Sequence, residues 1–180
     1  YTPMGQALIF VLYFIVTVLS IGGGYLPKLF VEKRGMNPYA GRMRAMLMFA
    51  FVPILALFAQ PLGVHSPWWP AVIIGLAGAA HQAWSANLYS TIGDMFPSST
   101  VASIVGIGTM AGGISSYLIN AGAGELFYYA GEQGAAFTFL DFEGKPAGYM
   151  IVFCICAVSY LLAWGAIKLL VPRYKKIEID

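Results

Sequence analysis

The sequence predicts an all-α polytopic membrane protein with five transmembrane helices. Hydrophobic residues make up 59% of the chain and charged residues only 10%, whereas about 25% of a soluble domain is charged. Five stretches reach the roughly 20 apolar residues that a helix needs to cross a bilayer. All five are too apolar for amphipathic surface helices. The predicted spans cover residues of about 6–29, 44–62, 68–93, 101–129 and 148–170.

The first two spans are joined by a basic connection, the next two connections are short, and the last is longer and acidic. The first span ends in the glycine tract that contains Gly23 and Gly24, just before Pro27. We expect this end to be either mobile or tightly packed, because glycine allows both. The segment 130–147 is polar and rich in glycine, and we expect an external loop there, with a small hairpin or lid as the alternative.

The distribution of Lys and Arg predicts which side each connection lies on. Connections and tails rich in Lys and Arg lie in the cytoplasm of membrane proteins. The predicted cytoplasmic cations are Lys28, Lys33, Arg34, Arg42, Arg44, Arg173, Lys175 and Lys176. This orientation places Tyr1 outside and the C-terminal Asp180 in the cytoplasm. Five spans with an external start are expected to follow at least one more helix upstream.

A polar stretch inside the third span is the strongest indication of function. At 100° per residue, His81, Gln82, Ser85 and Tyr89 fall within one quadrant of the helix, and a second polar strip adjoins it. Polar groups within a span usually face a bundle interior or a water-filled cavity. These side chains would suit sugar hydroxyls or a carboxylate. Alternatively, they hydrogen-bond neighbouring helices. The second strip consists of Trp84, Asn87 and Thr91.

Small residues and one acid mark candidate structural or gating positions. Gly112 and Gly113 in the fourth span would let another helix approach closely or let this helix bend. Asp94 ends the third span shortly before Pro97, and an acid at a helix C-terminus opposes the helix dipole. We therefore expect Asp94 to find a cation of the basic connection, or backbone amides near the next helix.

Other chemistries find little support in the sequence. The two histidines, His65 and His81, are too far apart for a metal motif, so we expect no metal site. Neither a phosphate-binding loop nor a nucleophile elbow is present. The cysteines Cys154 and Cys156 are two residues apart and would not face each other on a helix. An enzymatic function and a nucleic-acid partner are therefore not expected.

Two stretches of the chain resemble known transporters. The pattern from Gly22 to Gly35 is similar to the loop motif of the major facilitator superfamily, although Pro27 and Lys28 stand where that motif usually has an acid. The stretch from Ala80 to Pro97, followed by Val105–Gly-Ile-Gly-Thr-Met-Ala-Gly-Gly-Ile114, resembles the hexuronate branch of the anion:cation symporters. The resemblance covers essentially the whole chain.

This resemblance implies that the five spans are helices eight to twelve of a twelve-helix transporter in a bacterial inner membrane. The N-terminal bundle and the seventh helix would then be missing from this chain. The implied activity is proton-coupled uptake of hexuronates such as glucuronate or galacturonate, without a cofactor. The proton-carrying acids would belong to the missing bundle, which would be the main partner besides the lipid bilayer.

The resemblance also assigns roles to residues. It places Tyr89 and Thr109 at cavity positions, and it places Gly23, Gly24 and Arg34 in a gating loop motif. Three other interpretations remain open. The chain could carry another organic anion, such as an aldonate or a sialic acid. It could be a membrane-embedded enzyme that uses His81 as an acid or base, or a subunit of a membrane complex without transport activity.

Overall fold

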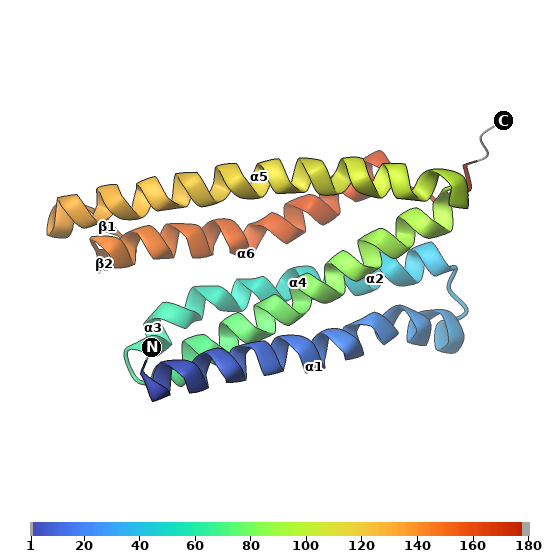
Figure 1. Cartoon of the computed structure of the whole chain (residues 1–180). Coiled ribbons are helices and arrows are strands. Elements are labelled where there is room, and N and C mark those ends of the chain that lie inside the picture. The colour runs from blue at the N-terminus through green and yellow to red at the C-terminus, as the bar shows by residue number, and fades with distance from the viewer. Residues whose placement is uncertain (1, 178–180) are drawn as a thin grey trace.

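The computed structural model describes residues 2–177 and is almost entirely helical, as the sequence predicts (Figure 1). Five long helical runs lie roughly parallel or antiparallel to one another. One of them is continuous from α2 through the 3₁₀ segment η1 to α3. A small hairpin of β1 and β2 joins the last two runs. The elements are α1 (Pro3–Arg34), α2 (Pro38–Phe51), η1 (Val52–Phe58), α3 (Ala59–Gly63), α4 (Trp68–Met95), α5 (Ser98–Gln133), η2 (Gly134–Ala136), β1 (Thr138–Phe139), β2 (Phe142–Glu143) and α6 (Lys145–Leu170).

Four of the five runs are long and apolar enough to cross a membrane. They are Pro3–Arg34, Pro38–Gly63, Ser98–Ala136 and Lys145–Leu170. The run α4 is long enough, because 28 residues span about 42 Å at 1.5 Å per residue. However, α4 is not among these four, so the structure supports four of the five predicted spans. Its polar stretch lowers its hydropathy, and its position among the other helices reduces the surface that would face lipid.

The first helix is longer than predicted. It continues through the glycine tract and Pro27 as far as Arg34, five residues beyond the predicted end at 29. Gly35 then stops it in the left-handed conformation with φ 60°, which glycine adopts without strain. The next helix begins at Pro38 rather than at 44, because the Asn37 side chain caps it by accepting a hydrogen bond from Ala40 N at 2.7 Å. α5 and α6 each begin three residues earlier than predicted.

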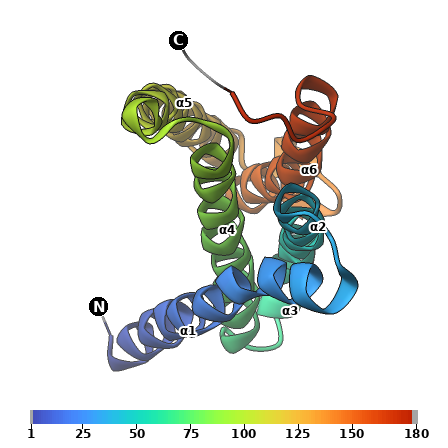
Figure 2. The same cartoon turned by 90° about the vertical axis from the view of Figure 1, so that its right-hand side faces the viewer.

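The helix α4 is the centre of the bundle. It packs along α1 on one side and against α2 and η1 on another, and it meets α5 near its own C-terminal end (Figure 2). The buried core at this centre contains Tyr39, Met43, Met46, Trp84 and Met95. α6 is attached to this core, since Trp164 Nε1 donates a hydrogen bond to Met43 O at 2.8 Å.

The helix α5 has few neighbours along its middle. Every residue from 106 to 122 is exposed, although the segment is rich in large apolar side chains such as Ile107 and Tyr117. Its neighbours are α4, which directly precedes it, and α6. Gly148 of α6 lies against Phe127 and Ala130 of α5.

The two ends of the bundle differ in charge. The predicted cytoplasmic cations all lie at the end where α1, α4 and α6 finish, at the right of Figure 1. The opposite end carries the exposed aromatic side chains of Trp68, Trp69, Tyr128 and Tyr129, as an interfacial belt would. Tyr1 and Asp180, whose sides the sequence predicts, lie outside the described residues.

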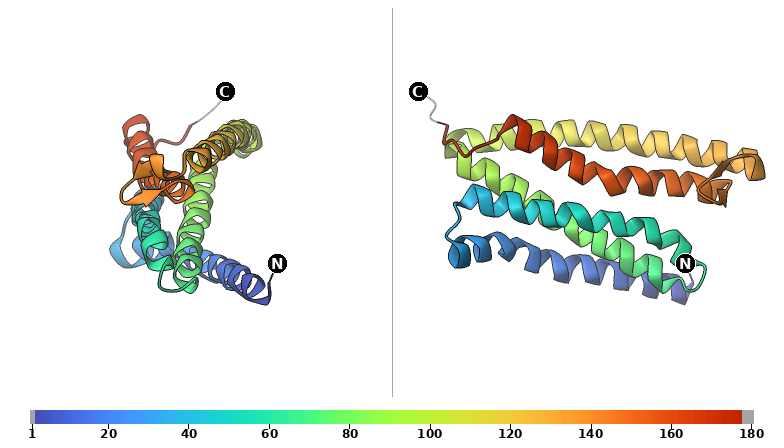
Figure 3. Two further views of the ribbon diagram at one scale, coloured as in Figure 1. Left: turned by 90° about the vertical axis from the view of Figure 1, so that its left-hand side faces the viewer. Right: turned by 180° about the vertical axis from the view of Figure 1, so that it is seen from behind.

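The segment 130–147 is not a plain loop, contrary to the expectation. The strands β1 and β2 pair antiparallel, with Phe139 opposite Phe142. Leu140 and Asp141 form the turn with φ values of 45° and 65°, the region that a two-residue hairpin turn requires. The hairpin lies against the start of α6, as the left view of Figure 3 shows. The alternative of a small hairpin is therefore the one that occurs.

Candidate functional site

The polar stretch of α4 divides into three sets that face different neighbours. Gln82, Ser85 and Tyr89 form the first set and turn toward an open face of the bundle. His81 forms the second and points to α6. The buried Trp84 and Asn87 form the third. The helical spacing predicts one set of His81, Gln82, Ser85 and Tyr89, whereas the structure separates His81 from the other three by pairing it with Tyr160 of α6.

The first set lies between α1 and α5. The neighbouring Gly78 is in tight contact with Val16 of α1, since a Cβ there would approach the Val16 side chain to 2.9 Å. On the other side, the Tyr89 hydroxyl lies 3.5 Å from Thr109 Oγ1 of α5. Gln82 and Tyr89 are exposed and Ser85 is half-buried. The residues of this set, together with Thr109, are defined here as the open polar face.

The geometry of the open polar face suits recognition of a neutral polar group. A phenol, an amide, and two aliphatic hydroxyls offer donors and acceptors without a formal charge. The 3.5 Å separation between Tyr89 and Thr109 is too long for a strong hydrogen bond. Thr109 Oγ1 already donates to Val105 O at 2.8 Å. The Tyr89 hydroxyl therefore keeps the capacity for a further, stronger hydrogen bond.

His81 is held by a residue that the sequence did not single out. Its Nδ1 atom is hydrogen-bonded to the Tyr160 hydroxyl of α6, and the Tyr160 ring also meets Trp84 edge-on at a centroid distance of 5.5 Å. Tyr160 interrupts a nearly continuous apolar run, and this was the only signal for it in the sequence. Which helix it would face depends on the packing of distant segments, which periodicity does not report.

Trp84 and Asn87 are packed in the core and do not reach the open polar face. Asn87 is 2% exposed, and its Nδ2 atom donates to Ala83 O of its own helix at 2.8 Å. Trp84 is 7% exposed, and its Nε1 atom has no hydrogen-bond partner among the described residues. This packing does not favour the predicted role of Trp84 and Asn87 in substrate binding.

Asp94 has the cationic partner that the sequence predicts. Arg42 Nε donates to Asp94 Oδ2 at 2.7 Å, and both side chains are partly buried. Arg42 belongs to the first turns of α2, so the pair ties the beginning of α2 to the end of α4. Arg34 lies elsewhere and places its guanidinium over the Phe30 ring at 5.7 Å. Pro97 directly precedes α5 and accepts a hydrogen bond from Thr100 N at 2.9 Å.

The candidate gating glycines have different surroundings. Gly23 is buried, and a Cβ added to it would approach the Ala83 methyl to 2.4 Å. Gly24, Gly112 and Gly113 have open space where a Cβ would be. Close helix packing therefore explains Gly23, whereas the two glycines of α5 pack against nothing in the described part of the chain.

Residues 2–177 contain no group of three or more His, Cys, Asp or Glu side chains placed to hold a metal ion. A cavity of about 560 Å³ lies apart from the open polar face, at the basic end of the bundle. Of the predicted polar strips, only Thr91 contributes to its wall. The open polar face is thus a surface of the bundle rather than a closed chamber.

Taken together, the apolar helices and the polar α4 define an all-α, membrane-embedded helical bundle. No protein-family model, curated protein or solved structure matches this chain.

Proposed function

We propose that this chain works in a secondary transporter that takes up hexuronates together with protons. The observation that supports the proposal most directly is the open polar face on α4 and α5. Gln82, Ser85 and Tyr89 offer uncharged hydrogen-bonding groups there, and Thr109 of α5 lies beside Tyr89. Sugar acids carry several hydroxyls that such groups can recognise.

The carboxylate of a sugar acid also requires a cation, and the open polar face has none. In the proposed transporter, a second bundle of the same polypeptide supplies this cation and the proton-carrying acids. The exposed middle of α5 is consistent with such a neighbour, because Ile107 and Tyr117 are 65% and 73% exposed. Transport would follow from alternating access to a site between the two bundles. We place the protein in a bacterial inner membrane with its basic end in the cytoplasm.

Uptake of a different organic anion, such as an aldonate or a sialic acid, remains the nearest alternative, since the open polar face does not distinguish among sugar acids. A membrane-embedded enzyme would need His81 as a free acid or base. The hydrogen bond with Tyr160 occupies one nitrogen of that imidazole, which gives the enzyme interpretation less support. A subunit of a membrane complex would leave the open polar face without a ligand.

Binding of glucuronate to the full-length protein would test the proposal. Loss of one buried hydrogen bond costs about 0.5–1.5 kcal/mol for a neutral partner and about 1.5–3 kcal/mol for a charged one. Tyr89→Phe and Gln82→Ala should therefore weaken binding by roughly three- to a hundredfold, while the melting temperature stays unchanged. Isothermal calorimetry and thermal melts measure both quantities.

Matched controls come from the other end of the bundle. Tyr149→Phe and Gln133→Ala remove the same chemical groups from exposed positions near the hairpin, and they should leave affinity unchanged. If Tyr89→Phe and Gln82→Ala bind glucuronate as well as the native protein but melt at lower temperature, these groups hold helices together and the proposal is wrong. Competition by aldonates and sialic acid in the same assay distinguishes the alternative substrates.

A further inference from the structure

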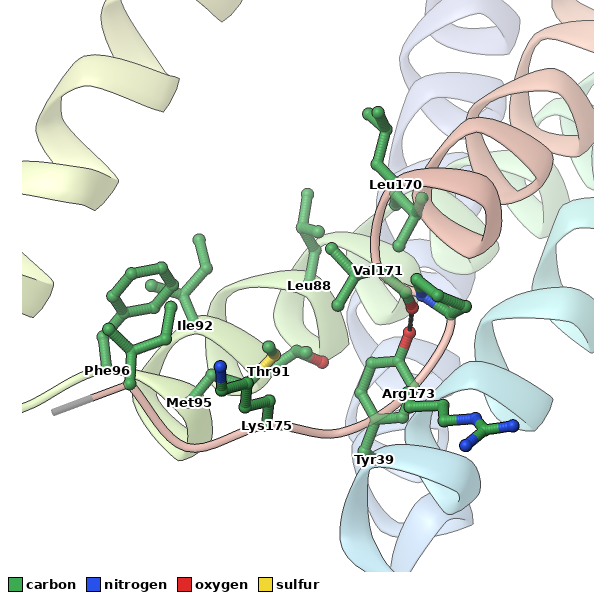
Figure 4. Close-up of a pocket in the computed structure, with 13 residues that line it drawn as sticks. Tyr39, Leu88, Thr91, Ile92, Met95, Phe96, Leu170, Val171, Arg173 and Lys175 are labelled. Atoms are coloured by element: carbon green, nitrogen blue, oxygen red, sulfur yellow. Dashed lines mark hydrogen bonds between the residues drawn. The ribbon is translucent and has the colours of Figure 1, made fainter.

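A cavity of about 560 Å³ lies at the basic end of the bundle, between the last turns of α4 and the end of α6 (Figure 4). Its α4 wall is formed by Leu88, Ile92 and Phe96, and its α6 wall by Leu170 and Val171. The cavity volume falls within the range of about 300–1,000 Å³ that is usual for small-molecule sites. The lining is predominantly apolar, so a bound molecule needs a substantial hydrocarbon part.

The segment that follows α6 forms the third wall and is held in place by hydrogen bonds. Ile177 N donates to Met95 O at 2.8 Å, and the Tyr174 hydroxyl donates to Asp94 O at 3.1 Å. The Tyr39 hydroxyl donates to Val171 O at the beginning of the segment. Figure 2 shows this segment crossing from α6 toward the corner where α4 meets α5. The wall is therefore fixed at both of its ends.

This third wall contributes the charge. Lys175 and Arg173 both line the cavity, whereas none of its described lining residues is acidic. In Figure 4, the Lys175 ammonium lies beside Met95 at the cavity, and the Arg173 guanidinium points away from it. A bound molecule would thus meet an apolar interior and one cation at the rim.

We propose that this cavity binds an anionic phospholipid, with an acyl chain along Leu88 and Ile92 and the phosphate at Lys175. Anionic headgroups bind basic pockets between membrane helices at the cytoplasmic side, and this cavity lies at the end of the bundle where the cations gather. A free phosphate would leave the apolar walls unoccupied. A neutral lipid would leave the cation without a partner. The proposal requires that the bundle is embedded in a membrane with its basic end in the cytoplasm, and it is independent of the proposed transport activity.

Lipid binding to the purified full-length protein in detergent tests the proposal. Native mass spectrometry would count bound phosphatidylglycerol, phosphatidylcholine with the same acyl chains, and glycerol 3-phosphate. One cation near an anionic headgroup changes affinity by about fivefold, so phosphatidylglycerol should bind about fivefold more tightly than phosphatidylcholine. Glycerol 3-phosphate should not bind, because it lacks the hydrocarbon chain.

Neighbouring lysines provide a matched pair of variants. Lys175→Ala should lower the affinity for phosphatidylglycerol by about fivefold and remove the preference over phosphatidylcholine. Lys176→Ala removes the same charge one residue further along, outside the cavity lining, and should change neither quantity. Equal effects of the two variants would mean that the tail attracts lipids only through its general charge, and would overturn the proposal.

A variant that fills the cavity provides a second test without changing charge. Ile92→Trp should abolish binding of both phospholipids at this site, whereas Ile107→Trp on the exposed face of α5 should leave binding unchanged. Retained binding in Ile92→Trp would overturn the proposal, as would equal affinity for the two phospholipids or binding of glycerol 3-phosphate alone. A dimer that excludes lipid from the native protein would identify a second copy as the occupant and would also overturn it.

Discussion

Substitution of two adjacent glycines in α1 should have opposite effects on stability. A Cβ at Gly23 would lie 2.4 Å from the Ala83 Cβ atom and 3.2 Å from Phe49 Cζ, whereas a Cβ at Gly24 would meet nothing within 4 Å. The Ala83 methyl cannot rotate away. Because carbon atoms pack best at about 3.5–4.0 Å, α1 and α4 would have to separate by about 1 Å or more.

The size of the effect follows from two terms. Replacing a glycine inside a helix with alanine stabilises it by about 0.5–1 kcal/mol, and this gain applies to both variants. The forced separation of well-packed helices costs about 1–3 kcal/mol, and it applies only to Gly23→Ala. Gly23→Ala should therefore be less stable than Gly24→Ala by about 1–3 kcal/mol, which corresponds to about 2–12 °C in melting temperature for a chain of this length.

Thermal melts of the purified protein in detergent would measure this difference. The double variant Gly23→Ala with Ala83→Gly removes the close approach, so a double-mutant cycle should recover most of the 1–3 kcal/mol as a coupling energy. Equal melting temperatures for Gly23→Ala and Gly24→Ala, or a cycle without coupling, would refute the packing argument and leave the glycine tract without a structural explanation.

Two further predictions concern the basic end and the orientation. Asp94→Asn breaks the 2.7 Å pair with Arg42 and should lower the free energy of unfolding by about 1 kcal/mol, because the pair is partly buried. Glu32→Gln breaks an exposed 3.6 Å pair with Lys28 and should not change the melting temperature measurably. Cysteines placed at Ser66 and Gly134 in a cysteine-free, full-length protein should react with impermeant reagents from outside, and cysteines at Lys33 and Lys176 only from inside; the reverse pattern would invalidate both the orientation and the resemblance.

Helical spacing was sufficient to predict that three residues of the open polar face lie together on α4, although it also grouped His81 with them, and His81 pairs with Tyr160 instead. Gln82, Ser85 and Tyr89 share an arc of α4 because of the 100° rotation per residue, and this relation does not depend on which helices surround α4. The partner of Asp94 was also predictable in kind, since an acid at a helix C-terminus near a basic connection favours a cation. Which of the cations it would be, Arg42, required the three-dimensional structure.

Relations between distant segments could not be predicted. The contact between His81 and Tyr160 joins helices 79 positions apart in sequence, and periodicity does not specify which helices meet. Likewise, the burial of Asn87 depends on the packing of α4 against its neighbours. The start of α2, in contrast, could have been predicted. Asn37 followed by Pro38 is a recognisable pair of helix cap and first-turn residue, but the prediction placed the start of this span by apolar residues alone.

The hairpin between α5 and α6 had no clear turn signal. Leu140 and Asp141 occupy positive φ values, for which glycine or asparagine is the usual choice. The expectation of a plain loop was therefore reasonable from the turn residues alone. The alternating tract from Phe137 to Phe142 was the better indicator, because Phe139 and Phe142 face each other across the hairpin.

The limited hydropathy of α4 has a consequence for how the protein enters a membrane. The translocation machinery inserts a helix according to the summed contributions of its residues to the free energy of insertion, and polar residues near the centre of the helix oppose insertion. α4 carries its polar residues near its middle, whereas α1 and the run from α2 to α3 are apolar enough to enter first. Because α4 packs against both, these earlier helices can receive it during synthesis. The helix with the polar stretch thus depends for its insertion on the helices that it later holds together.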